Sequence, residues 1–191
     1  GSPRHGRPAG FRLDGTLPKR IFFPENTRQL STALRRIAEL GGECTIAGAR
    51  TGIVGGAVSS GESLIVLEKM KSPVRLAEDQ PETGPCVRVS AGTTLDELAE
   101  SMSSLDFSTI EGIEPGARYF YPVDPTESTA SVGGTIATNA SGARTLAYGA
   151  TRNWVEALTA VLADGSVIEL TRGAKIANDG VFEIKRAGSS E

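Results

Sequence analysis

The segment CTIAGARTGIVGG, residues 44–56, decides the fold because it joins a short apolar run to a loop that holds four glycines. Residues 44–47 have the character of a buried strand. The glycines that follow let the backbone approach a ligand closely and turn several N–H groups toward one point. Such a loop suits an anion. It lacks the Gly-Lys-Ser/Thr of a Walker loop and does not open a helix as Gly-x-Gly-x-x-Gly, which argues against both nucleotide motifs.

The residues around this segment follow the order of a βαβ unit. Residues 20–23 indicate a short strand. Asn26 is a good N-cap, and Gln29 completes it in the style of a capping box, so a helix should begin here. Gly41-Gly42 allows a left-handed helix end. Residues 63–67 read as a second buried strand, and two strands separated by a helix predict parallel pairing.

A second set of elements follows a polar, turn-forming stretch at residues 77–85, which we expect to be a linker or an exposed hairpin end. Val87 and Val89 alternate with polar residues, as in a half-buried strand. Thr94 and Glu97 form a capping box, which predicts another helix. Its expected buried face consists of Leu95, Leu98, Ala99 and Met102.

The last third of the chain contains a second glycine-rich stretch. Residues 131–139 predict a turn that continues as a short helix, and Gly133-Gly134 near its start would expose free N–H donors. Residues 155–162 are strongly apolar. Asp164-Gly165 predicts a tight hairpin back to residues 167–170. Residues 181–184 suggest one more strand.

These elements predict a mixed α+β fold with two lobes. We expect an N-terminal arm at residues 1–19, a βαβ lobe at 20–76, a linker at 77–85 and a strand-rich lobe at 86–191. We see no internal repeat.

Composition narrows the function. The net charge of -3 argues against a nucleic-acid partner. No apolar run is long enough for a transmembrane helix, and the start lacks a signal-peptide core. Cys44 and Cys86 suit reduced thiols of the cytoplasm, which is where we expect the protein. His5 is the single histidine, so we predict no histidine-ligated metal, no metal site, and no histidine-based catalysis.

Charge placement links the two glycine-rich stretches. No Asp or Glu occurs between Cys44 and Gly61 or between Ser128 and Val155, although the chain is acidic. A nearby carboxylate would repel a negatively charged ligand in a pocket of low dielectric constant. Both stretches therefore suit one anionic ligand, and three arginines fall within them: Arg50, Arg144 and Arg152.

An ordered set of motifs resembles the FAD-linked oxidase family, the vanillyl-alcohol oxidase type of flavoprotein. The closest branch includes D-lactate dehydrogenases and the flavin subunit of glycolate oxidase. The matching segments run from about residue 20 to residue 170: Pro24-Glu25-Asn26-Thr27, residues 47–56, residues 89–98, Asp124-Pro125, residues 131–135, residues 137–142, Tyr148-Gly149 and residues 162–165.

The resemblance implies a PCMH-type FAD-binding domain, in which FAD lies between two α+β subdomains. Backbone N–H groups of Gly48, Ala49, Arg50, Thr51 and Gly52 would hold the pyrophosphate. Asp124, Pro125 and Thr126 would run beside the ribityl chain or the flavin ring. The other wall would consist of Ser131, Gly133, Gly134, Asn139 and Gly142, with Tyr148 and Gly149 nearby. The chain departs from the family at Arg50, where relatives often have glycine, and a positive φ there would strain an arginine.

The resemblance also implies activity and partners. A dehydrogenase or oxidase of this branch acts on a 2-hydroxy acid, and a cap domain that is absent from this chain would supply the substrate-binding and proton-abstracting groups. We therefore name no catalytic residue. No His or Cys lies at residues 47–57, which predicts non-covalent FAD. An iron–sulfur protein is a possible electron-transfer partner.

Other interpretations stay open. The chain could be a stand-alone flavin or nucleotide module without turnover, or a glycine-rich structural domain without nucleotide affinity. Each arginine could be a solvated surface group. Tyr148 could serve packing alone, and Asn139 could only cap the short helix.

Overall fold

The structure of the protein is a computed structural model that describes residues 17–59, 61–81, 84–174, 177–181 and 183–184. It contains both helices and strands in the predicted mixed arrangement. Short helices connect the larger elements, namely η2 (Leu67–Lys69), η3 (Phe107–Thr109), α4 (Thr145–Tyr148) and η4 (Thr151–Trp154).

A three-stranded parallel sheet confirms the predicted βαβ unit. Its strands are β1 (Arg20–Phe22), β2 (Cys44–Ala47) and β3 (Ser63–Val66), in the order β1-β3-β2. The central strand β3 is buried at all four positions, as expected of a strand covered on both faces, and its last three residues are apolar. The carboxyl end of β2 leads directly into the glycine-rich loop.

Helix α1 (Thr27–Glu39) connects β1 and β2 and begins as predicted. The Asn26 side chain accepts a hydrogen bond from the Gln29 backbone N–H at 3.0 Å. The Gln29 side chain accepts in return from the backbone N–H of Glu25 at 2.8 Å, one residue before the cap. Gly41 takes a φ of 60° and ends the helix, as expected from its conformational freedom.

The predicted polar stretch at residues 77–85 joins two paired strands. Strand β4 (Arg75–Leu76) pairs antiparallel with β5 (Val87–Arg88). Helix α2 (Leu95–Ser104) follows with the predicted capping box, in which the Thr94 N–H donates to the Glu97 carboxylate at 2.9 Å. Ala99 is exposed on α2, contrary to our expectation, because the buried face is narrower than the apolar stripe. The core around α2 consists of Leu98, Met102, Phe107 and Val132.

Strands β6 (Ala157–Val161) and β7 (Val167–Thr171) form the predicted antiparallel hairpin. At its turn only Gly165 takes a positive φ, of 80°. The Ser31 hydroxyl of α1 donates to the Gly165 carbonyl at 2.5 Å, which attaches the hairpin to α1.

Residues 181–184, predicted to be a strand, contain only an isolated bridge between Val181 and Asn178 within the part that is described, and residue 182 lies outside it. The predicted arm lies outside the described residues up to residue 16. None of the helices in the described part of the chain is long and apolar enough to cross a membrane.

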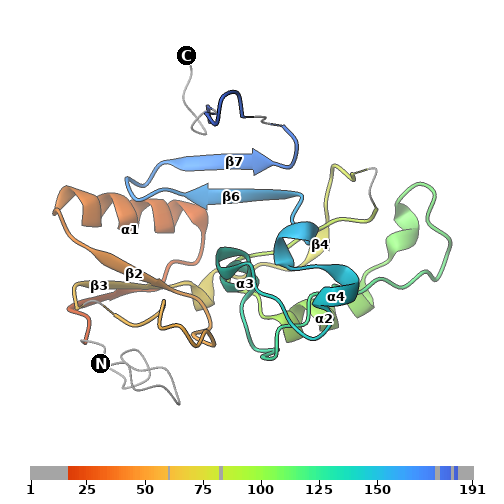
Figure 1. Ribbon diagram of the computed structural model, residues 1–191, viewed down its shortest axis with the longest axis horizontal. Helices are drawn as coiled ribbons and strands as arrows, with labels where there is room; N and C mark the ends of the chain where they lie inside the picture. The colour runs from red at the N-terminus through yellow and green to blue at the C-terminus, as the bar shows by residue number, and fades with distance from the viewer. Residues whose placement is uncertain (1–16, 60, 82–83, 175–176, 182, 185–191) are drawn as a thin grey trace.

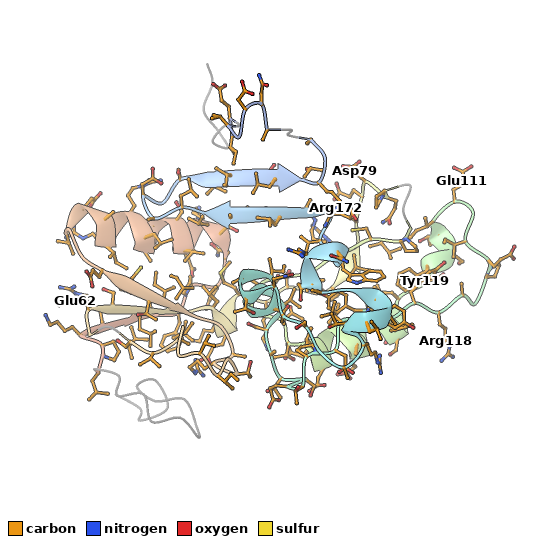
Figure 2. All side chains as sticks on the ribbon, viewed as in Figure 1. Glu62, Asp79, Glu111, Arg118, Tyr119 and Arg172 are labelled. Carbon is orange, nitrogen blue, oxygen red and sulfur yellow. The ribbon has the colours of Figure 1, made fainter. Side chains whose placement is uncertain are left out.

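Figure 1 shows how these elements are arranged. The parallel sheet and α1 lie at one end of the long axis, and α2 and α4 lie toward the other end, with the short helix α3 (Val132–Thr138) nearer the middle. The β6–β7 hairpin runs above α1. Figure 2 labels Arg172 at the end of β7, where its guanidinium donates to the Val155 carbonyl and ties the hairpin to the segment after η4.

Candidate functional site

The first glycine-rich loop leaves β2 at Ala47, which is fully buried, and becomes progressively more exposed. Among the described residues, the backbone N–H groups of residues 50–54 donate to no protein atom. Arg50 takes a φ of 61°, the left-handed conformation that the sequence raised as a source of strain. This loop therefore offers a run of free N–H donors.

The second glycine-rich stretch lies directly against the first. A Cβ atom at Gly48 would collide with the Ser131 side chain and would lie 3.8 Å from the Gly134 Cα. The Ser131 hydroxyl accepts hydrogen bonds from the Ala49 N–H at 3.4 Å and from the Gly134 N–H at 3.3 Å. Ser131 is 3% exposed. The two loops thus share one buried hydroxyl group, and Gly48 is required for their close approach.

Residues 91–94 hold Ser131 in this place. The Val132 N–H donates to the Thr93 carbonyl at 2.8 Å, and the Gly133 N–H donates to the Ala91 carbonyl at 2.9 Å. A Cβ at Gly133 would lie 2.8 Å from the Ala91 Cβ, so this approach also needs glycine. The sequence analysis assigned Thr94 to a helix cap and residues 91–93 only to the family resemblance, and it gave none of them a role in the site.

These contacts correct one expectation. We predicted that Gly133 and Gly134 would expose free N–H donors at the start of α3. Instead Gly133 donates to Ala91, and Gly134 donates to the hydroxyl of the N-cap residue Ser131. The free donors of the site therefore come from residues 50–54. The partner of Gly134 is the adjacent N-cap residue, whereas the partner of Gly133 lies some forty positions away in sequence, where local patterns carry no signal.

One carboxylate, that of Glu68, contacts the first loop, although no Asp or Glu occurs between Cys44 and Gly61. An Arg50 guanidinium nitrogen, Nη2, lies 3.3 Å from Glu68 Oε2 on η2. The other terminal nitrogen of this guanidinium, Nη1, is shielded from solvent and has no hydrogen-bond partner. It is the one such buried side-chain nitrogen or oxygen in the described part of the chain. A buried charged donor without an acceptor is costly, so this nitrogen would be stabilised by an anionic acceptor placed next to it.

The predicted other wall is divided in the structure: Ser131 and Gly134 lie against the first loop, whereas Gly142 forms a second cluster with Asp124 and Pro125. A Cβ at Gly142 would overlap the Asp124 carbonyl, so the backbones at 142 and 124–125 touch. The Arg144 guanidinium lies 3.4 Å from the Asp124 carboxylate. A hollow of about 150 Å³ adjoins Asp124, Pro125 and Arg144. Thr126 is exposed beside it.

Helix α3 connects the two clusters. Ser131 caps its start and Asn139 ends it with a φ of 47°, at a separation of about 10 Å for seven residues. The Asn139 side chain also accepts a hydrogen bond from the Arg152 N–H at 3.0 Å. A helix-ending role for Asn139 is thus present, as one interpretation of the sequence allowed.

Tyr148 and Gly149 lie next to the second cluster. The Tyr148 ring meets the Phe120 ring edge-on with centroids 6.0 Å apart, and its carbonyl accepts from the Trp154 indole N–H at 2.9 Å. Gly149 takes a φ of 79° and lies against Asn153. The Tyr148, Phe120 and Trp154 side chains are 41%, 58% and 45% exposed, so this aromatic group faces outward.

The larger of two surface hollows lies elsewhere. It has a volume of about 500 Å³ and is bounded by α1, β2 and Ala163. Cys44 lines it, and burial raises the pKa of this thiol. Cys44 also packs against the core of α1 and β3, as expected for a small apolar side chain. A protonated thiol is a weak nucleophile.

No group of three or more His, Cys, Asp or Glu side chains within the described segments could hold a metal ion. The main chemical feature of the site is the run of backbone N–H donors at residues 50–54 that have no partner among the described residues. A profile of the family described as FAD binding domain matches residues 18–171.

The chain belongs to this FAD binding domain family. Curated relatives include a D-lactate dehydrogenase of Anaerostipes hadrus, 34% identical over 80% of this chain and 29% of the relative. A D-lactate dehydrogenase of Archaeoglobus fulgidus is 33% identical over 78% of this chain and 30% of the relative. The glycolate oxidase subunit GlcD of Bacillus subtilis is 28% identical over 86% and 32%. The chain thus spans about three-tenths of the length of these relatives.

Solved structures share the fold of this FAD binding domain. A chitooligosaccharide oxidase matches with a TM-score of 0.63 and 22% identity over 84% of this chain and 31% of its own. A glucooligosaccharide oxidase from Acremonium strictum, described with a 6-S-cysteinyl, 8α-N1-histidyl FAD, matches with a TM-score of 0.63 and 21% identity over 84% and 30%. These likenesses confirm the predicted PCMH-type, α+β fold.

The residues of the first loop suit FAD. Within the described segments, five successive backbone N–H groups of this loop and one guanidinium nitrogen have no hydrogen-bond partner. A pyrophosphate is rich in acceptor oxygens and carries two negative charges, which this donor set matches. No side chain has to move aside from Gly48 for a ligand to approach the backbone there.

Proposed function

We propose that this FAD binding domain serves a flavin-dependent dehydrogenase or oxidase that acts on a 2-hydroxy acid of the D-lactate or glycolate type. The proposal is supported by the activities of the relatives named above, two D-lactate dehydrogenases and a glycolate oxidase subunit. The observation that carries it is the shared contact of the loops at Gly48 and Ser131, beside free N–H donors.

The first loop would hold the pyrophosphate. Its members are Gly48, Ala49, Arg50, Thr51 and Gly52. We place Asp124, Pro125 and Thr126 beside the ribityl chain or flavin ring. Ser131, Gly133, Gly134, Asn139 and Gly142 would line the opposite wall, with Tyr148 and Gly149 nearby. The separation of the two clusters by the length of α3 supports this assignment, since FAD is an extended ligand. We also propose that residues 20–76 and residues 86–191 form the two subdomains between which FAD binds.

When bound, FAD supplies an acceptor for the hydride that leaves the hydroxyl-bearing carbon of the substrate. The substrate becomes a 2-oxo acid, and its hydroxyl proton passes to a base. We assign no residue of this chain as that base, and we propose that it belongs to a cap domain of the whole protein. The chain's own residues would bind and orient the cofactor, and Gly48 and Gly142 would permit the close backbone approaches on which that orientation depends.

We further propose that the cofactor is held without a covalent bond. This is supported by the sequence of the loop, since neither His nor Cys lies at residues 47–57. Precipitation of the loaded protein with acid should leave the yellow colour in solution. Colour that stays with the precipitated protein would contradict the proposal.

Two proposals concern partners and location. The relative from Bacillus subtilis is by name a subunit of its oxidase, and we propose an iron–sulfur electron-transfer protein as a partner here. The free thiols of Cys44 and Cys86 support a cytoplasmic location. Co-purification with iron and labile sulfide, and fractionation of the source cells, test these two points.

The experiment on activity uses the intact protein. Purified protein loaded with FAD is mixed without oxygen with D-lactate, glycolate or D-2-hydroxyglutarate, and absorbance is followed near 450 nm. We expect one of these acids to bleach the flavin within seconds to minutes. Flavin that stays oxidised with all three acids, but is bleached by dithionite, would contradict the substrate class while leaving FAD binding intact.

A further inference from the structure

Arg50 has a backbone conformation that its side chain does not favour. Three non-glycine residues in the described part of the chain have positive φ angles: Arg50, Asn139 and Asp179. Asn and Asp tolerate this conformation through short polar side chains that bond locally, whereas arginine gains no such compensation. Strain of this kind persists where the surrounding structure or a function requires the residue. Glycine would serve the backbone of the loop better, so the side chain needs an explanation.

Of the two terminal nitrogens of the Arg50 guanidinium, only one has a hydrogen-bond partner in the described part of the chain. Its Nη2 atom is paired with the carboxylate of Glu68, while its Nη1 atom is buried with no acceptor. The Arg50 side chain is 18% exposed and that of Glu68 is 45% exposed. Glu68 therefore fixes one edge of the guanidinium, and the Nη1 donors lack the acceptor that a buried charged group requires.

We propose that the Arg50 side chain itself binds a phosphate oxygen of FAD, with Glu68 as the residue that positions it. This rests on the proposed placement of the pyrophosphate on the loop at residues 48–52. A guanidinium presents donors along more than one edge, so it can keep Glu68 on one edge and bind a phosphate on another. Nη1 has no hydrogen-bond partner in the described part of the chain, so a phosphate oxygen placed against it would displace no protein acceptor.

The surroundings of Arg50 favour an anion at this point. The backbone N–H groups of residues 50–54 are free on the same loop, and no carboxylate lies in the sequence between Cys44 and Gly61. The negative charge of the nearby Glu68 carboxylate is compensated by its ion pair with Arg50. The bound phosphate would thus complete a chain of alternating charges, carboxylate to guanidinium to phosphate.

The test compares the full chain with its R50G, R50K, E68Q and R36A variants. Glycine at position 50 relieves the backbone strain, so R50G should fold with an unchanged or higher melting temperature. R36A is the matched control, because it removes one positive charge and an exposed ion pair on α1, at 64% exposure. Dissociation constants are measured for FAD, for ADP, which has the adenosine and the diphosphate but no flavin, and for riboflavin, which has the flavin but no phosphate.

We expect R50G to bind FAD and ADP about tenfold to a hundredfold more weakly than the native chain, the range given by one lost hydrogen bond to a charged group. Riboflavin binding should be unchanged. R50K keeps the positive charge but lacks the planar guanidinium, so it should lose part of the affinity for FAD and ADP. E68Q should weaken the binding of both ligands a few-fold, because the guanidinium loses its positioning partner. R36A should match the native chain.

Two results would overturn the inference: R50G that binds FAD as tightly as the native chain, or R50G that loses riboflavin and FAD equally. The first would mean that a water molecule or a rearranged rotamer satisfies Nη1. A native chain that binds neither FAD nor ADP would instead contradict the proposed function itself, which is a different outcome from either of these.

Discussion

Replacing Ser131 by alanine removes the hydroxyl group that lies between the two glycine-bearing loops. This hydroxyl caps α3 by accepting from the Gly134 N–H at 3.3 Å, and it accepts from the Ala49 N–H at 3.4 Å. Loss of a serine N-cap costs about 1 kcal/mol, within a range of about 0.5–2 kcal/mol. The long contact to Ala49 adds about 0.5 kcal/mol at most. Ser131 is buried, so water cannot fully replace its bonds.

We therefore expect S131A to lower the free energy of unfolding by about 1–2 kcal/mol, and the melting temperature by about 2–8 °C for a chain of this size. Urea titration followed by circular dichroism measures the first quantity on the FAD-free chain. S128A is the matched control, because it removes an exposed hydrogen bond to Asp96 in the same segment and should cost less than about 0.5 kcal/mol. Equal stabilities for S131A and S128A would refute the reasoning that Ser131 joins the two loops.

Two further predictions concern backbone approach and pH. G142A should lower the free energy of unfolding by at least about 1–3 kcal/mol, because its Cβ would overlap the Asp124 carbonyl and the backbone must shift. Urea titration measures this change. An unfolding midpoint equal to that of the native chain would contradict it. The hydrogen bond from Lys71, with that from the Thr94 backbone, lowers the pKa of Glu97 below its ordinary value of 4.5. Its contribution to stability is therefore complete above pH 4.5 and is lost as pH falls through the lowered value. Between pH 6 and pH 3 the native chain should lose more stability than E97Q in urea titrations, and equal losses would contradict this assignment.

Local features of the fold could be predicted from the sequence because their causes lie within a few residues. The cap at Asn26 needs only Gln29 to be recognised, and the turn at Asp164-Gly165 needs only its own two residues. The parallel direction of β1 and β2 followed from helix α1 between them, although β3 lies between these two strands in the sheet. In each case the physical preference belongs to the chain itself and survives in the structure.

The rest of the site depends on contacts between distant segments. The sequence predicted a free N–H group at Gly133, but in the structure this group donates to the Ala91 carbonyl. Hydrophobic periodicity gives no indication of such a contact. The carboxylate of Glu68 reaches Arg50 from a different element, although the loop itself contains no acid. The charge pattern correctly indicated which loops converge, since Gly48 and Ser131 touch. The charge pattern could not indicate which backbone N–H groups stay without a protein partner once the two loops are in contact.

Hydrogen exchange followed by mass spectrometry, with and without FAD, tests the central claim most directly, because it reports on individual backbone amides. The account predicts that FAD slows exchange at residues 50–54, whose N–H groups have no protein partner, and leaves exchange around the hollow at Cys44 unchanged. Protection confined to α1 and β2, with no change at residues 50–54 in protein that demonstrably holds FAD, would contradict it.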